Sequence, residues 1–164
     1  MATVYRLASA GAWDELDLTG AAAKAVGGRW NHVGTPMVYA ASTIALAALE
    51  TIVHLGAVAA PLNRYVIALD IPDAFFRRRQ VVSPPPPDAW DAIPPSYKSK
   101  DFGSAWVRAA GSLLLDVPSV IVPQERNVLL NPLHPGIERV VARNLGRFLY
   151  DDRLRPPRSG APGK

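Results

Sequence analysis

The sequence contains no cysteine, which excludes disulfide bonds, thiolate nucleophiles and zinc or iron–sulfur sites built on cysteine. The first seventeen residues lack a basic stretch followed by an apolar run, so we expect no signal peptide and predict a cytoplasmic location. No membrane-spanning helix is expected either. Residues 30–49 carry no charged side chain, but polar residues, a glycine and a proline interrupt them: Asn31, His32, Gly34 and Pro36.

Three motifs of common enzyme classes are also absent. The sequence has no Gly-x-x-x-x-Gly-Lys phosphate loop and no Gly-x-Gly-x-x-Gly dinucleotide fingerprint. It also has no Gly-x-Ser-x-Gly nucleophile elbow. A function must therefore be sought in a less common constellation of residues.

The positive charge of the chain is confined to one end. The 164 residues include 18 basic and 14 acidic side chains, for a net charge of +4. The last twelve residues hold the whole surplus and no acid: Arg153, Arg155, Arg158 and Lys164. Residues 1–152 are therefore neutral overall. We predict a disordered basic tail over 153–164 and no direct binding of nucleic acid by the body of the protein.

The length and the pattern of apolar residues predict one mixed α/β (α+β) domain over residues 1–152. We expect a curved, split β-sheet with helices around it, and a proline-rich surface loop over 83–95. Expected strands cover 3–7, 64–70, 117–122 and 147–150, with a hairpin formed by 29–32 and 37–40. Helices are expected over 43–55, capped by Ser42, and over 101–115 and 137–144, with a loop over 127–135.

Glu50 is the most informative residue of the helix predicted over 43–55. It is the only formal charge there, and apolar neighbours surround the helix: Ile44, Leu46, Leu49, Ile52, Val53 and Leu55. A helix that is apolar on every side is normally buried. A buried carboxylate needs a partner, a proton or a ligand. Glu50 is thus either a structural ion-pair or surface residue, or a carboxylate in a binding cleft.

A metal site has little support. His54 lies four residues after Glu50 and hence on the same side of the helix. Two ligands do not make a site, and only His32 and His134 remain as nitrogen ligands. We therefore predict no metal, and expect His54 to hydrogen-bond Glu50 or to cap the pocket.

Two arginines and a tyrosine are further candidates. Arg29 follows two glycines, and Arg6 lies in the first predicted strand. Either guanidinium could bind a phosphate or pair with Glu50. Tyr39 could be a core aromatic, or could stack on a flat ring and give its hydroxyl to a ligand.

Two other features have weaker support for a function. Ser119 is a polar break in an apolar strand, but no nucleophile elbow surrounds it. The basic run 77–79 follows two phenylalanines and is typical of a solvated edge rather than of a nucleic-acid site.

Taken together, these residues resemble the RES domain, the toxin half of bacterial RES–Xre toxin–antitoxin pairs. The resemblance covers residues 3 to about 153 and rests on the order of short motifs along the chain. These motifs are Tyr5-Arg6, Gly28-Arg29-Trp30-Asn31 with Gly34, Tyr39-Ala40-Ala41-Ser42, Glu50 with His54, Val117-Pro118-Ser119, Asn127, Leu129-Leu130-Asn131-Pro132 and His134-Pro135.

The resemblance implies an ADP-ribosyltransferase-like fold and an enzyme that consumes NAD⁺ as a substrate and releases nicotinamide. The ADP-ribosyl acceptor in the family is water, inorganic phosphate or a protein. The resemblance gives catalytic roles to Arg29, Tyr39 and Glu50, and adds Arg6 and Ser119 as NAD⁺-binding residues. It also implies an Xre-type antitoxin partner in a hetero-oligomer, which we expect to cover the pocket with Arg29 and Glu50.

The resemblance thus predicts a toxin that depletes NAD⁺ by hydrolysis or phosphorolysis of the nicotinamide–ribose bond. An ADP-ribosyltransferase that modifies a protein is one alternative. A non-catalytic binding or regulatory module, in which the arginines and Glu50 are merely paired, is another. A nucleic-acid-binding protein is the third.

Overall fold

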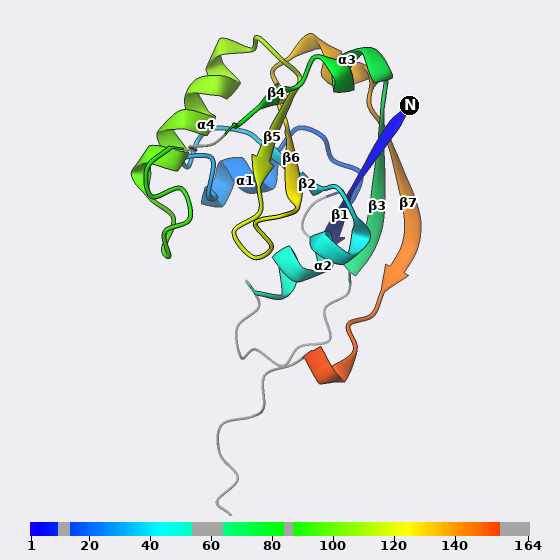
Figure 1. Ribbon diagram of the computed structural model, residues 1–164. Coiled ribbons are helices and arrows are strands. Elements are labelled where there is room, and N and C mark those ends of the chain that lie inside the picture. Colours follow the sequence, from blue (N-terminus) through cyan, green and yellow to red (C-terminus); the bar gives the residue numbers. More distant parts are fainter. Residues whose placement is uncertain (10–13, 54–63, 84–86, 155–164) are drawn as a thin grey trace, which may run out of the picture.

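The computed structural model describes residues 1–9, 14–53, 64–83 and 87–154. They form seven strands, four α-helices and two short 3-10 helices (Figure 1). The strands are β1 (Ala2–Ser9), β2 (Val38–Ala41), β3 (Arg64–Ile71), β4 (Gln80–Val81), β5 (Leu114–Pro118), β6 (Arg126–Leu130) and β7 (Val141–Phe148). The helices are α1 (Ala21–Val26), α2 (Ile44–Ile52), α3 (Asp73–Arg77), α4 (Tyr97–Ala109), η1 (Pro135–Arg139) and η2 (Asp152–Leu154).

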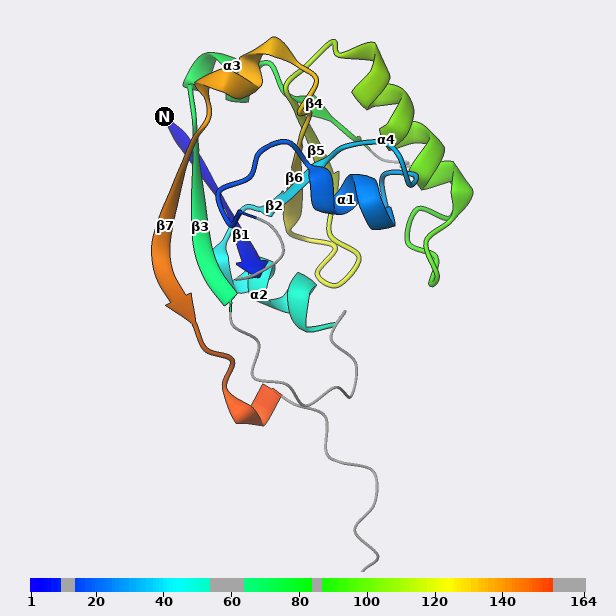
Figure 2. The same cartoon turned by 180° about the vertical axis from the view of Figure 1, so that it is seen from behind.

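All seven strands belong to one sheet in the order β4-β5-β6-β2-β1-β3-β7. Neighbours are antiparallel except β4 and β5. The two halves of the sheet meet between β1 and β2, where only Tyr5 and Ala41 are in register. Figures 1 and 2 show the halves close together near α2 and spread apart towards α3. The mixed α/β fold is thus confirmed, and the expected split corresponds to this narrow junction.

Side-chain alternation gives the sheet two faces with different roles. Residues that are opposite one another in paired strands share a face, and successive residues alternate. What we call the site face bears Tyr39 with its partner Leu129, and Ala41 with its partners Asn127 and Tyr5. The opposite face, the back face, bears the residues between them: Val4, Arg6, Val38, Ala40, Val128 and Leu130.

Each face carries its own apolar cluster. On the back face, buried strand residues pack against Phe75 and Phe76 of α3 and Ile137 of η1. On the site face, Trp106 and Val107 of α4 pack against a second cluster that includes Trp30, Met37, Leu115 and Leu129. A third, smaller cluster joins α2 to the sheet through Leu46, Ala47, Ala41 and Leu7. Burial on both faces explains why the central strands are rich in apolar residues.

Helix α2 is less buried than the sequence suggests. Its N-cap is Thr43 rather than Ser42, because the Thr43 hydroxyl accepts a hydrogen bond from the Leu46 amide at 3.0 Å. Only Leu46 and Ala47 are buried, whereas Leu49 is 37% exposed and Val53 is 56% exposed. The expectation of burial on every side is wrong, since α2 packs against the sheet on one side only. His54 lies outside the described residues.

Several other sequence-based boundaries are wrong. Residues 29–32 form no strand, so the expected hairpin is absent and β2 pairs with β6 and β1 instead. The helix predicted over 101–115 spans Tyr97–Ala109, because Ser96 caps it and the apolar residues after Gly111 enter β5. The strand predicted over 117–122 lies too late in the sequence, because β5 ends at Pro118. The first residues of the loop predicted over 127–135 belong to β6.

The C-terminal region also differs from its prediction. In place of a helix over 137–144 and a strand over 147–150, the chain forms η1 and then the long edge strand β7. Arg153 and Leu154, predicted as the start of a disordered tail, form the 3-10 turn η2 with Asp152. Residues 155–164 lie outside the described residues. Among the described residues, no helix is both long and apolar enough to cross a membrane.

Gly103 allows α4 to pack directly on the backbone of the segment that carries Arg29. A Cβ atom at position 103 would lie 1.9 Å from the Trp30 carbonyl oxygen. The change Gly103→Ala is therefore expected to lower the free energy of unfolding by about 3 kcal/mol, despite the better helix propensity of alanine. Urea denaturation measures this loss. Gly111→Ala is the matched control, because a Cβ there meets no atom within 4 Å. Equal stability of the two variants would contradict the packing argument.

Candidate active site

Glu50 lies on α2, above the site face of the sheet, and its side chain is half-buried. Its Oε1 atom accepts a hydrogen bond from the Ser119 hydroxyl at 2.8 Å and another from the Asn127 side-chain amide at 2.5 Å. Ser119 follows β5, and Asn127 belongs to β6. Two different segments of the chain therefore fix one carboxylate oxygen.

The hydroxyl of Ser119 can point its proton only towards Glu50. Ser119 is fully buried, and its Oγ atom accepts hydrogen bonds from the amides of Ile121 at 3.1 Å and Val122 at 3.0 Å. Because a hydroxyl has two acceptor lone pairs and one proton, these amides leave only the proton for Glu50. Ser119 is thus a positioning residue for Glu50, and its hydroxyl is not available as a nucleophile.

Asn127 is a contact of Glu50 to which the sequence assigned no role. It lies opposite Ala41 in the β2–β6 ladder, which places it on the site face below α2. The residues 127–135 read as a loop because asparagine and proline are frequent there. The alternation of Asn127 with the buried Leu129 is the signal that would have placed both on one side of a strand.

Tyr39 contributes its ring rather than its hydroxyl. The hydroxyl accepts a hydrogen bond from the Trp30 amide at 3.0 Å and donates its proton to Asn31 Oδ1 at 2.7 Å. Burial raises the pKa of Tyr39, so the hydroxyl stays neutral. The residue as a whole is only half-buried. The Tyr39 hydroxyl therefore cannot donate its proton to a ligand in this arrangement.

Asn31 organises the segment that carries Arg29. It is fully buried, and its side-chain amide donates to the carbonyl oxygens of Ala23, His32 and Thr35 at 2.9–3.2 Å. Gly28 is required next to it, because a Cβ there would lie 2.6 Å from the Tyr39 hydroxyl oxygen. The segment between α1 and β2 is thus held by side-chain contacts with backbone atoms, in place of the strand that was predicted.

Arg29 lies on the same side of the sheet as Tyr39 and Glu50. Its Nη1 atom donates to the carbonyl oxygens of Trp90 and Ala92, at 2.8 Å each. Burial lowers the pKa of Arg29, and the nearby charges of Glu50 and Asp91 oppose this shift. Arg29 therefore interacts electrostatically with Glu50 without forming an ion pair with any carboxylate in the described part of the chain.

Arg6 does not join the other candidates. It lies on the back face, and its Nη2 atom donates to the carbonyl oxygens of Glu15 and Asp17 at 2.7 Å each. Burial lowers the pKa of Arg6, and the charges of Asp17 and Asp14 partly offset this effect. The sheet separates Arg6 from Tyr39, so it holds the segment before α1 and does not share a pocket with Glu50.

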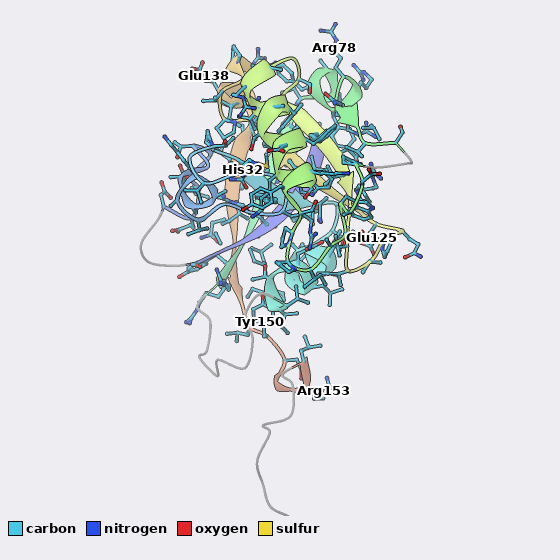
Figure 3. The ribbon with its side chains drawn as sticks, turned by 90° about the vertical axis from the view of Figure 1, so that its left-hand side faces the viewer. His32, Arg78, Glu125, Glu138, Tyr150 and Arg153 are labelled. Carbon is cyan, nitrogen blue, oxygen red and sulfur yellow. The ribbon has the colours of Figure 1, made fainter. Side chains whose placement is uncertain are left out.

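His32, His134 and the basic run lie apart from this site. His32 contacts Asp101 at 2.6 Å beside α4 (Figure 3), and His134 accepts the Gly136 amide to cap η1. The residues described here include no group of three or more potential ligands that could hold a metal ion. In the basic run, Arg79 pairs with Asp116 at 2.9 Å, and Arg78 lies at the end of the molecule opposite Tyr150.

The structure thus brings together Arg29, the Tyr39 ring and Glu50, with Ser119 and Asn127 behind the carboxylate. An oriented carboxylate can hold hydroxyl groups and stabilise positive charge. An aromatic ring can stack on a flat heterocycle, and the Nε and Nη2 atoms of Arg29 have no hydrogen-bond partner among the described residues. This combination suits a ligand with a flat cationic ring, a sugar and an anionic group.

The Tyr39 hydroxyl is expected to stabilise the segment around Arg29. Removing it in Tyr39→Phe leaves the Trp30 amide and Asn31 Oδ1 unpaired, which should lower the free energy of unfolding by roughly 1–3 kcal/mol. Because folding raises the pKa of Tyr39, the wild-type protein should also lose stability as the pH rises above about 10. That loss should be smaller in Tyr39→Phe. Urea denaturation at neutral and alkaline pH tests both effects, and Tyr97→Phe, at a residue that is 77% exposed, is the control.

Known proteins are similar to this chain in sequence and in fold. The sequence matches the RES domain over residues 3–151. It is 49% identical over 139 residues to a "Prs ADP-ribosylating toxin" of Sphingobium sp. (strain YBL2), which covers 84% of this chain and 86% of the relative. It is 37% identical over 123 residues to a "Toxin Res" of Photorhabdus laumondii, covering 75% of this chain and 78% of the relative.

A solved structure shares the fold. A chain from the crystal structure of the M. tuberculosis MbcT–MbcA toxin–antitoxin complex superimposes with a TM-score of 0.58 and 17% sequence identity. The match covers 87% of this chain and 83% of that one. By its sequence match over residues 3–151, this chain belongs to the RES domain family.

Proposed function

We propose that this RES domain protein is the toxin of a bacterial toxin–antitoxin pair and cleaves the nicotinamide–ribose bond of NAD⁺. The observation that carries the proposal is the Glu50 carboxylate, fixed by Ser119 and Asn127 beside Arg29 and the Tyr39 ring. The toxin names of the relatives support the biological role. NAD⁺ is a substrate in this proposal and not a resident cofactor.

Glu50 would stabilise the charge that develops during cleavage. When the bond between nicotinamide and ribose breaks, positive oxocarbenium character develops at the anomeric carbon, as in glycoside cleavage. A carboxylate held in one orientation stabilises this charge without reorganising. Ser119 and Asn127 supply that orientation through Oε1. No acid is required for the leaving group, because nicotinamide departs as a neutral ring.

Tyr39 and Arg29 would bind the substrate on either side of the reacting bond. The half-buried Tyr39 ring provides a flat surface for the nicotinamide or the ribose. Arg29 provides guanidinium nitrogens for the pyrophosphate, a role that the sequence had divided between Arg29 and Arg6. Since Arg6 is held by two carbonyl oxygens on the back face, the proposal assigns this role to Arg29 alone.

The change Glu50→Gln should reduce nicotinamide release by at least about 1000-fold, because the amide is uncharged at the developing oxocarbenium. The fold should persist, since glutamine keeps the size of the side chain and an acceptor oxygen for Ser119. Chromatography of nicotinamide formed from NAD⁺ measures the effect. Glu125→Gln is the matched control: Glu125 lies near α2 (Figure 3), and among the described residues its carboxylate has a hydrogen bond only from Thr43, at 3.5 Å. Near-normal turnover by Glu50→Gln would refute the mechanism.

A second candidate function is transfer of the ADP-ribosyl group to a protein. The observation that favours it is the 49% identity to a protein named as a Prs ADP-ribosylating toxin. Both functions share the cleavage step and differ only in the acceptor. The site described above is compatible with either acceptor.

Product analysis separates these functions. The protein is incubated with NAD⁺ labelled in the adenylate half, with and without inorganic phosphate, and with and without the Prs protein. NAD⁺ depletion predicts free ADP-ribose, or ADP-ribose-1″-phosphate when phosphate is the acceptor. Protein modification predicts label on Prs. If nicotinamide is not released in any mixture, both enzymatic proposals fail and a non-catalytic binding module is favoured.

An antitoxin partner completes the proposal. The solved structure with the same fold comes from a toxin–antitoxin complex, which supports a protein partner here as well. We expect that partner to be of the Xre type, to form a hetero-oligomer with this chain and to cover the pocket with Arg29 and Glu50. Its effect would be to keep NAD⁺ in the producing cell, in the predicted cytoplasmic location, away from Glu50.

A further inference from the structure

The guanidinium of Arg29 is bound by a turn within the proline-rich loop 83–95. The two carbonyl oxygens that accept from Nη1 belong to Trp90 and Ala92, each at 2.8 Å. Asp91 lies between these two residues. The backbone on both sides of Asp91 therefore touches the guanidinium, and the Asp91 carboxylate is close enough to interact electrostatically with Arg29.

This turn is fixed to the body of the protein. Within it, the Trp90 amide donates to the Pro87 carbonyl at 3.0 Å, and the Ala92 amide donates to the Ala89 carbonyl at 3.2 Å. The Trp90 ring stacks on Trp30, with ring centroids 6.4 Å apart and an interplanar angle of 24°. Because Trp30 is only 2% exposed, its ring is a fixed support for Trp90. The backbone of the turn that contains Asp91 is therefore held in place.

Two carboxylates therefore lie near the same arginine. Glu50 and Asp91 both interact electrostatically with Arg29, so this group carries one positive and two negative charges. Asp91 is exposed and has no ion pair among the described residues, whereas the other acid of the turn, Asp88, pairs with Lys98 at 2.8 Å. Of Arg29, Glu50 and Asp91, only Asp91 is exposed, so its carboxylate adds negative charge where a group from solvent would approach Arg29 and Glu50.

We propose that Asp91 is a specificity-determining residue that disfavours anionic acceptors of the ADP-ribosyl group. The acceptor is then a neutral nucleophile, namely water or a hydroxyl or amine of a protein, and not inorganic phosphate. This inference rests on the proposed cleavage of NAD⁺. Of the three acceptors that the RES resemblance leaves open, it excludes inorganic phosphate and keeps water and a protein.

The reaction with such an acceptor is balanced without any further reagent. The bond between C1 of the ribose and the nicotinamide nitrogen breaks, and its electron pair stays on nicotinamide. A lone pair of the acceptor oxygen or nitrogen forms the new bond to C1, and the proton of the acceptor passes to water. A phosphate anion would follow the same path, but it would approach C1 against the charges of Glu50 and Asp91.

The experiment compares the wild type with Asp91→Asn and Asp91→Lys. Each protein receives NAD⁺ and increasing inorganic phosphate, and anion-exchange chromatography gives the ratio of ADP-ribose-1″-phosphate to ADP-ribose. We expect this ratio to rise about tenfold in Asp91→Asn and further in Asp91→Lys, because the repulsion is removed and then reversed. Added sodium chloride should reduce the difference in product ratio between the wild type and the Asp91 variants, since salt screens exposed charges.

Asp88→Asn is the matched control, because it removes the same charge from the same turn on the side facing Lys98. Its product ratio should equal that of the wild type. Normal nicotinamide release with the same ratio in the wild type and both Asp91 variants overturns the role of Asp91 but leaves the cleavage proposal intact. If the wild type releases no nicotinamide, the cleavage proposal fails and this inference fails with it.

Discussion

The hydrogen bond from Ser119 to Glu50 is the contact on which the site depends. Two backbone amides occupy the lone pairs of the Ser119 hydroxyl, so its proton has a single direction. Asn127 then adds a second donor to the same carboxylate oxygen. The carboxylate of an exposed helix is thereby oriented by the ends of two sheet strands. This explains how α2 can be only partly buried and still present Glu50 in one position.

Arg29 is held by backbone carbonyl groups and not by a carboxylate. Its anchors are carbonyl oxygens of Trp90 and Ala92, and its own segment is ordered by Asn31 acting on three further carbonyl oxygens. Carbonyl groups orient a guanidinium without neutralising it, whereas an ion pair with Glu50 would occupy both charges. The structure therefore keeps the Arg29 cation close to Glu50, while its Nε and Nη2 atoms have no hydrogen-bond partner among the described residues.

The sequence was sufficient for the elements whose pattern is local. The apolar run after Arg64 predicts β3 almost to its ends, and the apolar residues around Glu50 predict α2 within a few residues. It was insufficient where the same residues suit two structures. The apolar residues 113–115 extend the pattern of α4, and Asn127 resembles a loop residue until its pairing with Ala41 is known. Contacts of Arg29 with backbone oxygens have no sequence signature, because any residue provides a carbonyl.

Arg6 shows why a motif position alone does not establish a role. Strand β1 is apolar on both faces, with Val4 and Ala8 on one and Leu7 on the other, so alternation in the sequence does not say which face meets Glu50. The single pair between Tyr5 and Ala41 decides it, because it places the residues next to Tyr5 on the back face. This pairing places Arg6 on the opposite side of the sheet from Arg29, although the sequence had grouped the two arginines. The charge at the site is accordingly one arginine against Glu50 and Asp91, and this balance favours a cationic reacting centre over an anionic acceptor.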